Sequence, residues 1–195
     1  MGYKDNKVKL YTSQSKIVVD ILKEEEHLFV RREFIEKKYG EVSNIFLEAY
    51  DWYSYKAKDI VKKPQGAGYP VWAFTEAEYA GYYPGSYLIT LEVPIKEIIF
   101  FRMEDWNKIL NLSYLAKDEK DQEKFNIKIK DYNISNESDA FTKPFYPHIK
   151  SEIIKSWDNL FTKGNLLNEN NLCKVHLQAS LWEIRREWII EIKEC

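Results

Sequence analysis

The order in which strand-like and helix-like patterns follow one another constrains the fold of this chain more than any other feature. An alternating stretch at 7–12 passes at once into a helical pattern, further strands occupy the middle of the chain, and two strand patterns close it. Strands and helices are grouped and do not alternate strictly, as they would in a doubly wound parallel sheet. We therefore predict an α+β fold with a mixed or antiparallel central sheet flanked by helices.

The individual segments are predicted from their periodicity and from turn-forming residues. The clearest strand is 87–94, because polar and apolar residues alternate and β-branched residues are frequent. A first helix should follow Ser13 or Ser15, and the longest one, at 42–57, should end before Pro64. Further strands are expected at 71–74, 98–101, 175–184 and 187–192, with Arg185 and Arg186 as an exposed turn, and further helices at 105–110, 118–130 and 151–161.

The whole chain, 1–195, is predicted to be a single domain. It shows no internal repeat, low-complexity tract or break in composition. With 195 residues, of which 45% are hydrophobic, it can bury roughly 70% of the surface that its unfolded form exposes. Because only two cysteines are present, no disulfide framework is expected.

Charge and hydropathy exclude several kinds of partner. Twenty-nine basic residues against 31 acidic ones give a formal net charge of -2, so there is no strong nucleic-acid signal. No stretch approaches the roughly 18 consecutive apolar residues of a membrane span, and the first residues contain no apolar signal core. We expect a cytoplasmic protein that does not enter a membrane.

Common catalytic and metal-binding motifs are also missing. The three histidines lie far apart, and Cys173 with His176 would form only half of a zinc site, so no metal is predicted. There is no G-x-S-x-G nucleophile motif. The sequence 66–68 has two glycines but lacks the third glycine or the lysine of a phosphate-binding loop, and it is more typical of a plain turn.

Aromatic and polar residues are the more informative features. Aromatic side chains make up 15% of the chain, more than a core normally needs, and Gln178 lies within an otherwise apolar strand. On a regular strand Gln178 and Glu183 face opposite sides, and only a bulge would bring them together. Glu183 has two interpretations: an exposed carboxylate paired with Arg185 or Arg186, which the residues alone favour, or a carboxylate at a cleft that stabilises a developing cation.

Several short motifs, taken in order, resemble an uncharacterised bacterial family catalogued as domain of unknown function 3841. They are spread over nearly the whole chain, which makes the family resemblance specific although it implies no activity. The motifs are LYTSQ at 10–14, AYDW at 49–52, YPVWAF at 69–74, LEVP at 91–94, DW at 105–106, LN at 110–111, KSW at 155–157 and QASLWEI at 178–184.

More distantly, the layout is similar to small ADP-ribosyltransferase domains. It shares a first strand of the type Leu-Tyr-x-x-x-Ser, an immediate helix, a middle strand near aromatic residues and a late strand with a glutamate. This resemblance implies that NAD is the substrate, that first-strand residues contact the nicotinamide ribose, that an aromatic ring stacks on nicotinamide, and that a late glutamate is catalytic. It implies first-strand contacts for Thr12 and Gln14, stacking for Tyr79, Tyr82 or Tyr83, and catalysis for Glu183. Tyr11 and Trp72 are further candidates for binding, and Gln178 is a further candidate for catalysis.

Three functions follow as hypotheses. The first is a nucleotide-binding protein that transfers ADP-ribose from NAD to an unknown macromolecular acceptor, or cleaves NAD, as a bacterial toxin or defence factor. The second is a non-catalytic module in which the aromatic loop 64–85 and the tryptophans bind a base or a peptide, and the third is an accessory protein whose tryptophans are all core. The first requires the strands at 8–12 and 175–184 to lie near each other in the sheet, because both must contribute to one site.

Overall fold

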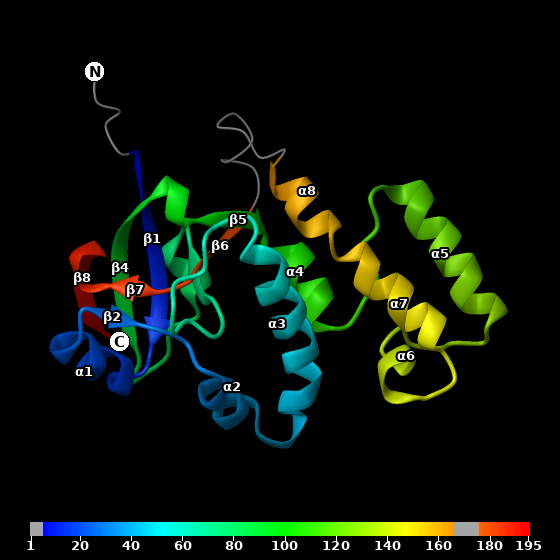
Figure 1. The fold of residues 1–195 in the computed structure, drawn as a ribbon, viewed down its shortest axis with the longest axis horizontal. Coiled ribbons are helices and arrows are strands. Elements are labelled where there is room, and N and C mark those ends of the chain that lie inside the picture. The colour runs from blue at the N-terminus through cyan, green and yellow to red at the C-terminus, as the bar shows by residue number, and fades with distance from the viewer. Residues whose placement is uncertain (1–5, 166–175) are drawn as a thin grey trace. The chain divides into compact units, whose positions relative to one another are not determined.

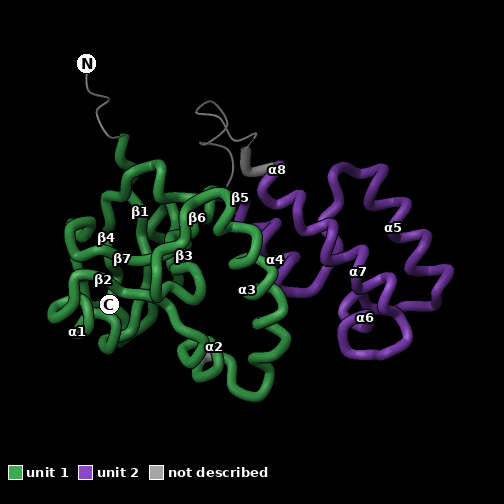
Figure 2. The backbone as a smooth tube through the Cα atoms, in the orientation of Figure 1, with its two compact units in different colours: residues 1–100, 177–195 green, residues 101–176 purple. Residues whose placement is uncertain are grey.

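The computed structural model describes residues 6–165 and 176–195. The chain forms two compact units, one within 1–100 and 177–195 and the other within 101–176 (Figure 2). The second unit is therefore inserted into the first. A division into units does not test whether the chain folds as one domain, so the single-domain expectation stays a prediction.

The first unit is built on a six-stranded sheet with the order β5-β6-β3-β1-β4-β8 (Figure 1). The pairings of β1 with β3 and β4, of β3 with β6 and of β4 with β8 are antiparallel. The predicted α+β class with a mainly antiparallel sheet is thus confirmed. The strands are β1 (Lys7–Gln14), β3 (Val71–Phe74), β4 (Tyr87–Pro94), β5 (Ile99–Arg102), β6 (Leu177–Leu181) and β8 (Ile189–Glu194).

A second, two-stranded sheet and short helical segments complete this unit. Strand β2 (His27–Leu28) pairs antiparallel with β7 (Ile184–Arg185). The predicted helix at 42–57 is found one residue shorter, as α3. The helical segments are α1 (Lys16–Glu24), α2 (Arg32–Tyr39), η1 (Gly40–Val42), α3 (Ser43–Ala57), η2 (Ala77–Ala80), η3 (Ile95–Glu97) and η5 (Arg186–Trp188).

The side-chain alternation of the strands gives the six-stranded sheet two different faces. One face carries Leu10, Val71, Ala73 and Leu91, which are buried against Leu22 of α1 and form the main core. The residues between them on the same strands, such as Tyr11 and Trp72, therefore lie on the opposite face. We call this opposite side the polar-aromatic face.

The second unit is helical and has its own core. Trp106, Trp157 and Ile153 are almost fully buried, and the Trp157 indole donates a hydrogen bond to the Ser113 carbonyl at 2.8 Å. The predicted helix at 151–161 is divided in two, because the chain turns at Trp157. The helices are α4 (Met103–Leu110), α5 (Glu119–Asp131), α6 (Asp139–Thr142), α7 (Pro147–Ser156) and α8 (Asn159–Asn165).

The end of the chain differs from the predicted hairpin. The late strand stops at Leu181, a separate strand β7 follows, and the short helix η5 precedes β8. Arg186 is exposed, as predicted, but it begins η5 and its guanidinium donates hydrogen bonds to carbonyl groups at the end of α1. Residue 175, the predicted start of the late strand, lies outside the described residues.

Within residues 6–165 and 176–195, none of the helices has the length and apolar character that a membrane crossing needs.

Candidate functional site

The register of three neighbouring strands brings together residues that are far apart in the sequence. Tyr11 of β1 lies opposite Phe74 of β3, and Phe74 lies opposite Gln178 of β6. Because directly opposed residues of antiparallel strands point to the same side, all three lie in one row on the polar-aromatic face. Strands β1 and β6 are not direct neighbours, because β3 lies between them, but they do not lie on opposite edges of the sheet, which would exclude the transferase hypothesis.

Gln178 is the most unusual member of this row. Only 4% of the residue is exposed, and its side-chain amide has no hydrogen-bond partner among the described residues. The amide atoms are not fully buried, so they keep some access to solvent and can reach a ligand on this face. Tyr11 and Phe74, by contrast, are only partly buried. A ligand that contacts their rings and hydrogen-bonds to Gln178 would satisfy this amide.

Beside this row, α3 packs two tyrosines against the same face. The Trp72 indole donates a hydrogen bond to the Tyr50 hydroxyl at 2.8 Å, and the hydroxyls of Tyr53 and Ser180 are 2.5 Å apart. Both tyrosine rings meet the Trp72 ring edge-on, with centroids 5.5 and 5.1 Å away. Burial raises the pKa of Tyr50 and of Tyr53, so both stay neutral at physiological pH. These contacts with α3 therefore hold the Trp72 ring in a fixed orientation on the polar-aromatic face.

Thr12 and Gln14 lie on the core face, away from Tyr11. Tyr11 and Phe74 pair where β1 meets β3, and next to this pair the Thr12 hydroxyl donates a hydrogen bond to the Trp72 carbonyl at 2.8 Å. The Gln14 amide donates in turn to the Thr12 hydroxyl at 2.7 Å. These two hydrogen bonds link the side chains of β1 to the backbone of β3. The predicted contact of Thr12 and Gln14 with a ligand stays a prediction.

Glu183 belongs to a third group, together with His27 and Arg185, which we call the Glu183 cluster. Only 3% of Glu183 is exposed, and its carboxylate lies 2.6 Å from His27 Nδ1 and 2.8 Å from Arg185 Nε. His27 and Arg185 face each other across β2 and β7. The expected pairing with Arg185 is present, but the expected exposure of Glu183 is wrong, because the small sheet covers it. Burial alone would lower the pKa of Arg185, but the bond to Glu183 raises it above its usual value.

Sequence reasoning did not find His27. It precedes Glu183 by 156 positions, and no local pattern distinguishes it from a surface histidine. Nor did it find Phe74 and Tyr53, since their role depends on sheet order and helix packing. The proposed late pair is also divided: Gln178 lies within β6, whereas Glu183 follows the end of that strand and binds the small sheet.

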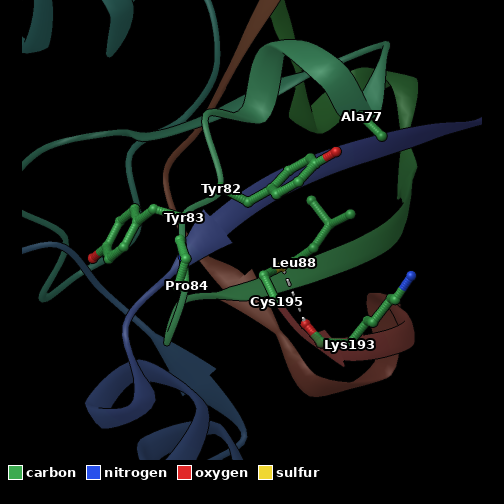
Figure 3. A pocket seen from close by; sticks show the side chains of 7 residues that line it. All are labelled: Ala77, Tyr82, Tyr83, Pro84, Leu88, Lys193 and Cys195. Atoms are coloured by element: carbon green, nitrogen blue, oxygen red, sulfur yellow. Dashed lines mark hydrogen bonds between the residues drawn. The ribbon is translucent and has the colours of Figure 1, made fainter.

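Tyr82 and Tyr83 are not members of the Tyr11 row. They line an open groove. About half or more of each residue is exposed, 51% and 60% respectively. The groove has a volume of about 520 Å³ and is shown in Figure 3. Its lining consists of Ala77, Tyr82, Tyr83, Pro84, Leu88, Lys193 and Cys195.

No group of three or more potential metal ligands is found in the part of the chain that the structure describes. Cys173, half of the weak zinc motif, lies outside that part.

A family model described as a domain of unknown function, DUF3841, matches residues 9–190. The chain belongs to this family. The match covers nearly all of the six-stranded sheet and the inserted helical unit, and it confirms the family identified from the ordered motifs. Neither the curated proteins nor the solved structures provide a match.

Proposed function

We propose that the polar-aromatic face binds NAD and cleaves the bond between nicotinamide and ribose, with transfer of ADP-ribose to water or to a macromolecular acceptor. The observation that carries this proposal is the row formed by Tyr11, Phe74 and Gln178 on three neighbouring strands. It combines two partly buried aromatic rings with a side-chain amide that has no hydrogen-bond partner among the described residues and is not fully closed off from solvent.

These residue types suit the reaction. A flat heteroaromatic ring such as nicotinamide stacks on aromatic side chains, and the Gln178 amide can hydrogen-bond to a ribose hydroxyl. In the reaction, the bond between ribose C1′ and the nicotinamide nitrogen breaks, and its electron pair leaves with nicotinamide. The acceptor oxygen then bonds to C1′ and releases its proton to solvent. The contribution of the protein is to fix the ribose and to direct the Gln178 dipole toward the developing positive charge.

In this proposal Gln178, not Glu183, is the catalytic residue. Both Glu183 oxygens already contact cationic or proton-bearing groups, namely His27 and Arg185. A carboxylate bound in this way contributes little negative charge to a reacting ribose. We assign Glu183 a structural role, in which it fixes the chain immediately after β6.

The test is the release of nicotinamide from NAD by the purified full chain, with and without cell extract as a source of acceptor. We expect Gln178→Ala to reduce turnover by about 100-fold, the usual cost of removing one preorganised polar group. Gln122→Ala is the matched control, because Gln122 is on helix α5 of the other unit and bonds to Asn126. A wild-type protein that neither binds NAD in calorimetry nor releases nicotinamide would contradict the proposal.

The groove beside Tyr82 favours a second candidate, a non-catalytic binding module. A groove with exposed aromatic rings can bind a ligand without any catalytic group nearby. Binding of NAD without any release of nicotinamide, in the presence of cell extract, would support this function and exclude the first.

A further inference from the structure

The groove lies on the same face of the sheet as the Tyr11 row. Ser13 is two residues after Tyr11 on β1, and Leu88 on β4 lies opposite Ser13. Lys193 on β8 lies opposite Leu88. Two of the groove's lining residues therefore continue the polar-aromatic face toward the outer edge of the sheet. From the spacing of residues along strands and between strands, Tyr11 and Lys193 are roughly 12 Å apart.

The groove combines an aromatic platform with a cation. The Tyr82 ring lies above the Leu88 side chain, whereas the Tyr83 ring points away from it beyond Pro84 (Figure 3). Within the described chain, Lys193 takes part in no ion pair. An aromatic ring over an apolar floor suits a nucleobase, since every base has a face that stacks, and a nearby ammonium group suits a phosphate.

Glu191 limits how strongly this cation attracts phosphate. It lies opposite Thr90, two residues before Lys193, and so shares its face of β8. We therefore expect stacking on Tyr82 to provide most of the affinity and Lys193 to provide a smaller, salt-dependent part.

We propose that this groove binds the adenosine monophosphate half of a dinucleotide whose nicotinamide half lies on the Tyr11 row. The inference rests on the proposed function, which it deepens by assigning the two halves of NAD to separate places. The two places lie on one face and are separated by a distance that a pyrophosphate with its two riboses spans. Tyr82 therefore contacts the adenine and not the nicotinamide.

The experiment titrates the full chain separately with AMP, adenosine and nicotinamide mononucleotide in a calorimeter. We expect Tyr82→Ala to weaken AMP binding by about tenfold or more, as expected for a lost stacking ring, and to leave nicotinamide mononucleotide unaffected. Tyr132→Ala is the matched control, because Tyr132 is a partly exposed tyrosine after α5 that does not line the groove, and this variant should bind AMP like the wild type. Lys193→Ala should weaken AMP but not adenosine.

The outcomes separate this inference from the proposed function. AMP binding that depends on Tyr82, together with no binding of nicotinamide mononucleotide, supports the groove and contradicts NAD cleavage. Equal losses in Tyr82→Ala and Tyr132→Ala, or no AMP binding by the wild type, would overturn the inference. Loss of nicotinamide mononucleotide binding in Gln178→Ala, with AMP binding retained, supports both.

Discussion

Glu183 is buried, and only one of its two ionic partners lies near it in the sequence. Arg185 is two residues away, but the 2.6 Å contact comes from His27, on the other strand of the small sheet. Side-chain exposure is 4% for the carboxylate, 44% for the histidine and 32% for the arginine. A buried carboxylate is tolerated when such partners are in place, and removing one member of the group leaves the others poorly paired.

We expect Glu183→Gln to lower the free energy of unfolding by about 1–2 kcal/mol, less than for a fully buried pair because both partners are partly exposed. Urea denaturation measures this change. Nicotinamide release per folded molecule should stay near the wild-type value, because the residue acts through β7. Glu187→Gln is the control, since Glu187 also approaches Arg185 but is 70% exposed. A fully stable Glu183→Gln that has lost turnover by 100-fold would instead make Glu183 catalytic.

The exposure of Glu183 was mispredicted for a physical reason. Two-residue strands such as β2 and β7 leave almost no periodic signal, and their pairing joins residues more than 150 positions apart. The sequence did place Gln178 on a face of its strand. It could not show that Phe74 and Tyr11 would share that face, because sheet order is not a local property.

At the scale of elements, the C-terminal end of α1 is capped by Arg186, a residue more than 150 positions away in the sequence. The Arg186 guanidinium donates to the carbonyls of Leu22, Lys23 and Glu25 at 2.8–2.9 Å. The last carbonyl groups of a helix have no partner within the helix, and a positive charge near them is favourable. This arginine fixes α1, which covers the core face of the sheet, to the segment between β7 and β8.

We expect Arg186→Ala to lower the free energy of unfolding by about 1–2 kcal/mol, more than a surface ion pair contributes. Arg186→Lys should recover only part of this loss, because an ammonium group keeps the charge but not the planar fork. Urea denaturation followed by circular dichroism provides the comparison. Identical midpoints for Arg186→Ala and the wild type would show that the cap is not needed in solution.

Elements with strong local patterns were predicted well. The strand at 87–94 has the predicted bounds, and α3 begins one residue after the predicted start. The helix expected at 151–161 was correct in type, but the break between α7 and α8 was missed. That break follows from tertiary packing, because the buried Trp157 bonds to Ser113 on a distant segment. Periodicity alone does not show such a contact.

At the scale of the whole molecule, β5 belongs to both compact units. Its first two residues fall in the unit that contains the six-stranded sheet, and Phe101 and Arg102 fall in the helical unit. Loss of the helical unit would therefore disturb an edge strand of the sheet. This shared strand favours coupled unfolding of the two units.

We expect a single calorimetric unfolding transition, with a van't Hoff enthalpy equal to the calorimetric enthalpy. Differential scanning calorimetry of the full chain measures both quantities. Two resolved transitions would show that the units unfold independently and would also contradict the single-domain prediction for 1–195.

The chain leaves the sheet along β5 and returns along β6, and these two strands are neighbours in the sheet. The backbone N–H of Met103 also donates to the carbonyl of His176 at 3.0 Å, which joins the two ends of the inserted segment. Evolution can therefore lengthen, shorten or exchange the segment between these residues without altering the order of the strands. A gene encoding this sheet could acquire a new accessory module at this point while keeping Tyr11, Lys193 and the other residues of the polar-aromatic face in register.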